Sequence, residues 1–153
     1  MDPPRPQLRD DVVALRPWRA EDVPAKFAAF SDPVVQRFSW PGREPYTEAD
    51  AWATHGAHTR AWEDGTSAEF ACVEPTDDRA LIGGASVYDI DTDQRQASVG
   101  YWVASHARRR GVATHATRLL AGWAFAALEA RFGIEHDVAS IPGLCERFGL
   151  TFG

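Results

Sequence analysis

The sequence lacks the features that mark several large classes of protein. Its two cysteines, Cys72 and Cys145, lie far apart and neither has a close-spaced partner, so we expect buried free thiols, no disulfide framework and no metal site. There is no run of about 18 apolar residues, which excludes a membrane-spanning helix, and no apolar segment follows the charges at the start, as a signal peptide requires. These absences predict a cytoplasmic protein with no membrane partner.

Positive charge is scarce as well, and asparagine is absent. The formal net charge is −6, and Lys26 is the only lysine. The missing asparagine and the scarce lysine are both interpreted as compositional bias. An acidic chain argues against a nucleic-acid partner, which would need a basic face, and favours a cationic partner such as an amine. The 153 residues suffice for one domain, residues 1–153, and are too few for two domains with separate cores.

The first half of the chain predicts two helices. Residues 20–22 would open one, because acidic residues are stabilised in a first turn by the helix dipole, and it would stop near Pro33. Thr47 begins a capping signal, so a second helix is expected to start there and to end at Gly65. The apolar side of that second helix would hold residues 49, 52, 53, 56 and 57.

The second half predicts an antiparallel meander and then a long helix. Short apolar runs between turn residues indicate strands, which are expected at residues 12–16, 69–74, 80–88, 96–103 and 134–138. Between residues 111 and 130 the apolar positions recur at helical spacing, which predicts the best helix of the chain. The fold class is therefore α/β, with a mixed, mostly antiparallel sheet flanked by helices.

The segment that carries chemistry is the turn between the strand at residues 96–103 and the long helix. Backbone N–H groups at a helix start have no intrahelical partner, and the helix dipole adds positive charge there, so they form an anion site suited to a pyrophosphate. Small residues let phosphate oxygens approach the backbone. The binding groups would be the backbone of Arg109, Arg110, Gly111, Val112, Ala113 and Thr114, with the side chains of Arg108 and Arg110 as charge partners.

This segment also resembles a known family. The pattern Arg108-x-x-Gly111-x-Ala113 matches the Q/R-x-x-G-x-G/A acetyl-CoA motif of the GNAT superfamily of N-acetyltransferases. Further stretches resemble its subgroup of ribosomal-protein N-terminal acetyltransferases: Gly100-Tyr101-Trp102, Leu15-Arg16-Pro17-Trp18, Ser31-Asp32-Pro33 and Glu146-Arg147-Phe148-Gly149-Leu150. The resemblance covers nearly the whole chain in the right order.

The resemblance implies acetyl-CoA as cosubstrate and a cofactor geometry. Pantetheine would lie between the strand that ends near Val103 and a neighbour near Ile134, pairing with the strand as an added strand would. One N–H among Tyr101, Trp102 and Val103 would polarise the thioester carbonyl. The acceptor would be a primary amine, either a protein or peptide N-terminus or a small molecule, that attacks the acetyl group directly.

The catalytic base and acid are where the chain departs from the family. Members often carry glutamate where Ser98 stands, and some carry a tyrosine acid where Cys145 stands. A base must remove a proton from the amine, and the other candidates are Glu69, Asp89 and Asp91. Among all these positions we select Ser98, Asp89 and Glu69 as the candidate catalytic residues.

The end of the chain departs as well. The family normally continues past Gly149-Leu150 with two more strands, which form part of the acceptor pocket and protect a sheet edge. Either the chain is a fragment, or a partner chain supplies the edge as in a homodimer, or the acceptor site is open. A second hypothesis therefore stands beside the enzyme: a degenerate acyl-CoA-binding or protein-interaction module without turnover. A third is that the arginine-rich turn binds another nucleotide.

Overall fold

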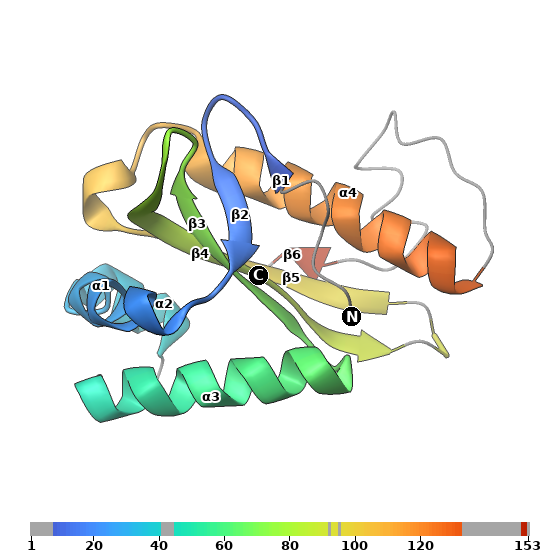
Figure 1. Cartoon of the computed structure of the whole chain (residues 1–153), viewed down its shortest axis with the longest axis horizontal. Helices are drawn as coiled ribbons and strands as arrows, with labels where there is room; N and C mark the ends of the chain where they lie inside the picture. Colours follow the sequence, from blue (N-terminus) through green and yellow to red (C-terminus); the bar gives the residue numbers. More distant parts are fainter. Residues whose placement is uncertain (1–7, 41–44, 92, 95, 133–150, 153) are drawn as a thin grey trace.

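The computed structural model describes residues 8–40, 45–91, 93–94, 96–132 and 151–152. Within them one sheet has the strand order β1-β2-β3-β4-β5-β6, with the first five antiparallel and β6 parallel to β5 (Figure 1). The strands are β1 (Leu8–Arg9), β2 (Ala14–Pro17), β3 (Ala68–Glu74), β4 (Asp77–Asp91), β5 (Gln96–Val103) and β6 (Thr151–Phe152). The expected antiparallel meander and the α/β class are confirmed.

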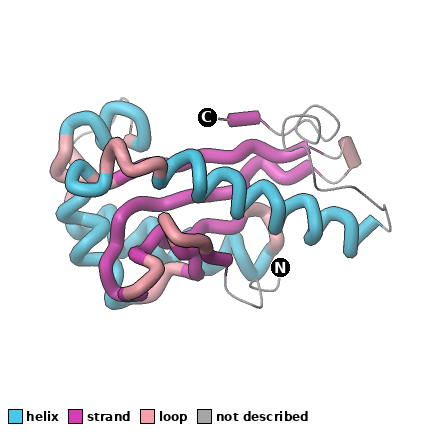
Figure 2. The backbone as a smooth tube through the Cα atoms, turned by 90° about the horizontal axis from the view of Figure 1, so that it is seen from above, coloured by secondary structure: helices cyan, strands magenta, loops and turns pink. Residues whose placement is uncertain are grey.

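The helices lie on both faces of this sheet. Figure 1 shows α4 along one face and the three earlier helices on the other, and Figure 2 shows α4 crossing the strands. The helices are the short 3-10 turn η1 (Ala20–Asp22), α1 (Val23–Ala29), α2 (Pro33–Ser39), α3 (Glu48–Asp64), the 3-10 turn η2 (Ser105–Ala107) and α4 (Val112–Phe132). No described helix is long and apolar enough to cross a membrane.

The larger core lies between α4 and the sheet. The apolar side of α4, including Val112, Ala116 and Leu120, packs on Leu15 and Phe70 of the strands, and all of these are buried. At one end the core is closed by aromatic rings from both layers, since Trp62 of α3 stacks on Trp123 of α4 at 6.0 Å between ring centroids. The helical periodicity of residues 111–130 therefore predicted the buried side of α4 correctly.

Helix α3 confirms its predicted ends but not its predicted face. The Thr47 hydroxyl accepts a hydrogen bond from the Asp50 amide, and Asp50 accepts one from the Thr47 amide. Gly65 ends the helix with φ of 72°, a conformation open mainly to glycine. The expected apolar side is wrong, however, because Trp52 is 47% exposed and the inward residues are Ala51, Thr54, His58 and Trp62.

Some expectations fall outside the described residues or on unforeseen elements. The strand at residues 134–138, the end at residues 146–150 and Cys145 lie outside the described part. Cys72 is a buried free thiol, as expected, and burial raises its pKa. Strand β1, which pairs Leu8 with Leu15, is too short to have been predicted from periodicity.

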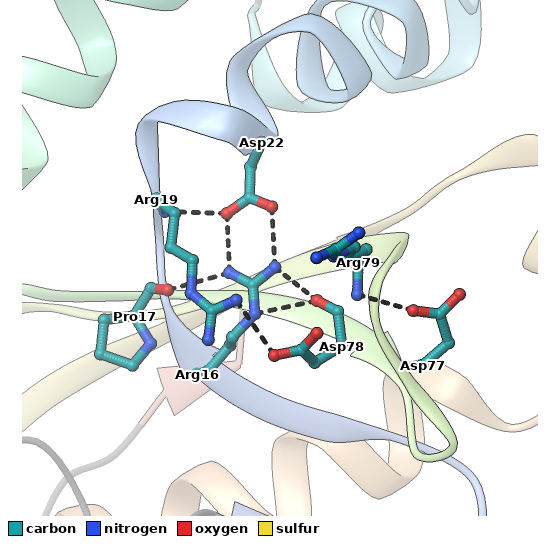
Figure 3. Close-up of polar contacts among 7 residues, drawn as sticks. All are labelled: Arg16, Pro17, Arg19, Asp22, Asp77, Asp78 and Arg79. Atoms are coloured by element: carbon teal, nitrogen blue, oxygen red, sulfur yellow. Dashed lines mark hydrogen bonds and ion pairs between the residues drawn. The ribbon is translucent and has the colours of Figure 1, made fainter.

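A buried ion pair fixes the connection between β2 and the first helical turn. Arg16 and Asp22 are 3% and 5% exposed, and both guanidinium Nη atoms donate to the Asp22 carboxylate at 2.7 Å (Figure 3). The same guanidinium donates to the carbonyl oxygens of Pro17 and Asp78. Burial acts to raise the pKa of Asp22, but hydrogen bonds from Arg16 and from the Arg19 amide outweigh it and lower the pKa.

Replacing Asp22 by asparagine is expected to destabilise the fold by about 3 kcal/mol at pH 7, because the Arg16 charge would stay buried without its counter-ion. Because the pKa of Asp22 is lowered, its stabilisation is present at neutral pH and is lost as the pH falls through that lowered value. Urea unfolding of the two proteins measures the difference. Asp78→Asn is the matched control: its ion pair with Arg19 is about half exposed on both sides, and such pairs contribute about 1 kcal/mol or less. Equal losses in the two variants would contradict the argument.

Candidate active site

The turn before α4 has the backbone shape that an anion site needs. Arg109 and Gly111 both have positive φ, 62° and 77°, and strain of this kind in a non-glycine residue gathers at functional sites. The His115 amide donates to the Gly111 carbonyl at 3.0 Å, so the helical bonding starts there and the preceding amides have no intrahelical acceptor. A cavity of about 220 Å³ opens on these groups and is lined by Val103, Ala107, Arg108, Arg109, Gly111, Val112, Ala113 and Thr114.

Two of the three arginine side chains are held by carboxylates. Arg108 pairs with Asp32 at 2.7 Å, and Arg110 pairs with Glu74 at 2.8 Å. Asp32 also accepts a hydrogen bond from the Val34 amide as the N-cap of α2, so it ties α2 to the turn. Arg109 is exposed and has no ion pair with any described residue. Two ion pairs therefore hold the turn in place, and the positive charge of Arg109 is exposed to solvent.

A second, larger cavity lies on the other side of β5. It encloses about 330 Å³ between the sheet and the helices α1 to α3. The strand residues Gly100, Tyr101 and Trp102 line it, whereas Val103, the next residue, lines the cavity at the turn. The remaining walls are mostly aromatic and come from Trp18, Phe30, Phe38, Trp40, Tyr46 and Tyr88. Consecutive residues at the end of one strand thus line the two cavities.

Three titratable groups face one another in the larger cavity. Burial raises the pKa of Glu69 to about 7, and the nearby charge of Lys26 opposes that shift. Burial lowers the pKa of Lys26 to about 8 against the attraction of Glu69. Burial, with the charge of Lys26, lowers the pKa of His58 to about 4, so His58 is neutral at pH 7. Its Nε2 lies 3.9 Å from Glu69 Oε1, too far for a hydrogen bond. The pKa of the Glu69 carboxyl therefore lies close to neutral pH.

Trp102 forms the floor of this cavity because β4 has glycine opposite it. Gly84 pairs with Trp102 in the sheet register, and a Cβ at Gly84 would lie 2.4 Å from the indole Nε1. The indole therefore lies directly over the glycine. It stacks on Trp18 at 6.2 Å and meets Phe30 edge-on at 5.1 Å between ring centroids, which joins β5 to the start of the chain and to α1.

Comparison with known families identifies the family to which the chain belongs. The sequence matches the family described as Acetyltransferase (GNAT) domain over residues 13–141. The chain belongs to the GNAT acetyltransferase family. The match begins one residue before β2 and includes both cavities, and the resemblance inferred from the motif is confirmed. No curated protein sequence matches the chain.

Solved GNAT structures share the fold at low sequence identity. RimJ from Mycobacterium smegmatis, in complex with CoA-disulfide, is 23% identical, with a TM-score of 0.64 and coverage of 84% of this chain and 66% of its own. Spermidine N-acetyltransferase from Vibrio cholerae, in complex with CoA and spermine, is 16% identical, with a TM-score of 0.64 and coverage of 78% and 68%. RimL, a ribosomal L7/L12 alpha-N-protein acetyltransferase in complex with coenzyme A, is 15% identical, with a TM-score of 0.66 and coverage of 76% and 66%. The chain thus spans just under two thirds of the RimJ and RimL chains.

The three catalytic candidates and the further base candidate Asp91 occupy different places in this GNAT domain. Glu69 on β3 lines the larger cavity. Asp89 is exposed, with φ of 50°, and is not among the residues that line it. Ser98 lies on β5 opposite Tyr88, and Asp91 lies at the end of β4; neither lines it. The structure therefore brings one of the candidates together with the cavity.

The ten residues expected to bind the cofactor divide between the two cavities. The turn cavity takes Val103, Arg108, Arg109, Gly111, Val112, Ala113 and Thr114. Tyr101 and Trp102 line the larger cavity, and the Arg110 side chain turns to Glu74. Sequence reasoning missed Lys26, His58 and the aromatic wall. The lysine carried a signal, since it is the only one in the chain.

Proposed function

We propose that this GNAT domain transfers the acetyl group of acetyl-CoA to a primary amine by direct attack. The observation that carries the proposal is that consecutive residues at the end of β5 line the two cavities, Trp102 the larger one and Val103 the one at the turn. One offers unbonded amides at a helix start, which suit a pyrophosphate, and the other holds a carboxyl with a pKa of about 7. A thioester that reaches from the first to the second would present its acetyl group to an amine beside that carboxyl.

The cofactor would bind through backbone groups. The pyrophosphate would rest on the amides of residues 109–114, with exposed Arg109 adding positive charge. Pantetheine would pair with β5 as an added strand. Strand β6 covers β5 only at Ser98 and Val99, and among the described residues none pairs with that side of residues 100–103. An N–H of Tyr101, Trp102 or Val103 would then stabilise the oxyanion.

Glu69 would act as the general base. An amine must lose a proton to attack and to yield the amide, and a carboxyl with a pKa near 7 is close to the ideal for that task at neutral pH. Neutral His58 beside it does not neutralise the carboxylate. Aromatic ring faces attract cations, so the wall of the cavity and Glu69 both favour an amine. A small amine or the first residue of a peptide would fill about 330 Å³. The homodimer and the cytoplasmic location stay predictions.

The experiment is a thiol-release assay with acetyl-CoA and a panel of polyamines, aminoglycosides and short peptides. At least one amine is expected to release CoA above background. The rate constant kcat should rise with pH through an apparent pKa of about 7, because the base works as the carboxylate and is lost as the pH falls through that value. Acetyl-CoA binding measured by calorimetry with no release for any amine would instead support the binding module without turnover. Competition by ATP as strong as that by CoA would support a different nucleotide.

A further inference from the structure

The only lysine of the chain is buried against the larger cavity, which the proposed function assigns to the amine acceptor and which we call the acceptor cavity. Lys26 lies on α1, is 5% exposed and lines the same cavity as Glu69 and Trp102. Its ammonium lies 5.0 Å from the Trp18 ring centre and 5.7 Å from that of Phe30. It makes no hydrogen bond or ion pair with a described residue within the usual distances. Lysine is almost never so buried without a partner, so this position calls for an explanation.

The amine of Lys26 lies against aromatic rings that also contact β5. The two rings beneath it are the ones that contact Trp102, at 6.2 Å from Trp18 and 5.1 Å from Phe30. Trp102 belongs to the strand segment along which the thioester would lie, and it lines the cavity next to Lys26. The lysine therefore lies over two rings of the aromatic wall that connect it to Trp102 of β5.

The surroundings also make this amine reactive. Burial lowers its pKa to about 8, so about a fifth of it is uncharged at pH 7.4, against roughly one part in a thousand for an ordinary lysine. The titratable groups that face the cavity with it are Glu69 from β3, His58 from α3, Tyr46 before α3, and Tyr88 and Tyr101 from β4 and β5. Of these, Glu69 is the one that can accept its proton near neutral pH.

We propose that Lys26 is an internal acceptor: in the absence of an external amine, bound acetyl-CoA transfers its acetyl group to Lys26 Nζ. The inference rests on the proposed function. The uncharged nitrogen attacks the thioester carbonyl, a C–N bond forms, the C–S bond breaks and CoA leaves as the thiolate. The nitrogen passes its proton through a water molecule in the cavity to Glu69, with which it makes no direct ion pair, and Glu69 passes the proton on to the thiolate.

The modification would inhibit the enzyme. An acetyl group on Lys26 would fill part of the cavity of about 330 Å³ that the acceptor needs. It would also remove the positive charge that holds down the pKa of Glu69, so the pKa of that base would rise further. Transfer to an external amine should therefore slow as Lys26 becomes acetylated.

The test is peptide mapping of the full chain after incubation with acetyl-CoA at pH 8 without an added amine. Because the chain has a single lysine, acetyl-lysine can arise only at Lys26, and the peptide map separates it from the N-terminal amine. We expect one acetyl group on Lys26 in the native chain, none on the same peptide of Lys26→Arg, and at least tenfold slower modification in Gly111→Glu at low acetyl-CoA concentration. The chain unfolded in urea gives the rate of uncatalysed acetylation.

The outcomes separate this inference from the proposed function. If external amines are acetylated while Lys26 stays unmodified, Lys26 is not an acceptor and the proposed function stands. If Lys26 is modified as fast in the unfolded chain or in Gly111→Glu, the acetylation is not catalysed by the site and the inference is wrong. If acetyl-CoA does not bind, both fail. The wild-type map decides the question even if Lys26→Arg proves unstable.

Discussion

Replacing Glu69 by glutamine is expected to lower kcat about 10²–10⁴-fold, the usual contribution of a general base, while acetyl-CoA affinity stays within about twofold. Glutamine keeps the shape of the side chain but cannot take a proton from the amine. The pH limb near 7 should disappear at the same time, because that limb belongs to the carboxyl. Thiol release over pH 6 to 9 measures kcat, and calorimetry measures acetyl-CoA affinity.

Asp89→Asn is the comparison for this variant. It makes the same carboxyl-to-amide change at an exposed residue that does not line the acceptor cavity, and asparagine tolerates the positive φ found there. Its kcat should equal that of the wild type. A large loss in Asp89→Asn with full activity in Glu69→Gln would move the base to the end of β4.

Replacing Gly111 by glutamate is expected to weaken acetyl-CoA binding at least tenfold, which corresponds to about 1.4 kcal/mol. The new carboxylate would stand at the mouth of the turn cavity and repel the pyrophosphate. A side chain at φ of 77° would also strain the turn that orients the amides. Calorimetric titration with acetyl-CoA at low ionic strength measures the loss, and a thermal melt separates it from unfolding.

The matched control is Gly122→Glu, the same substitution at a glycine inside α4. A Cβ at Gly122 would have no atom within 4 Å, and the residue lies well inside α4, away from its first turn. Acetyl-CoA affinity should be unchanged, and glutamate favours the helix more than glycine does. Equal weakening of binding in both variants would show that net charge, rather than the turn, controls acetyl-CoA affinity. Equal affinity of Gly111→Glu and the wild type would show that the pyrophosphate does not bind at this turn.

The elements with local signals were predicted well. The bounds of β5 agree with the expectation for residues 96–103, and the Thr47 cap and Gly65 set the ends of α3. These signals lie in a few adjacent residues, so no tertiary contact is needed to interpret them. The turn at Gly111 was also predicted from a local signal, because a glycine between a strand and a helix of clear periodicity marks the start of that helix.

The acceptor cavity could not be predicted from periodicity, which assumes that the inward side of a helix is apolar. At this cavity the inward side of α3 carries polar residues. Helix α3 turns Thr54 and His58 toward the cavity and leaves Trp52 exposed. The apolar pattern therefore pointed to the wrong face. For the same reason Glu69 was one of several candidates, because the sequence does not show that side chains of α1 and α3 line the same space as Glu69. The scarcity of lysine was interpreted as compositional bias, and nothing in the sequence indicated that Lys26 lines that space.

The pairing of Gly84 with Trp102 makes the acceptor cavity open to redesign. The indole can lie on the sheet only while position 84 has no side chain, because even a methyl group would come within 2.4 Å of it. Substitution there would lift the ring toward α1 and displace the rings of Trp18 and Phe30 that rest against it. Substrate selectivity could thus be narrowed by a substitution under the cavity floor, with the Glu69 carboxyl and the cofactor turn left as they are.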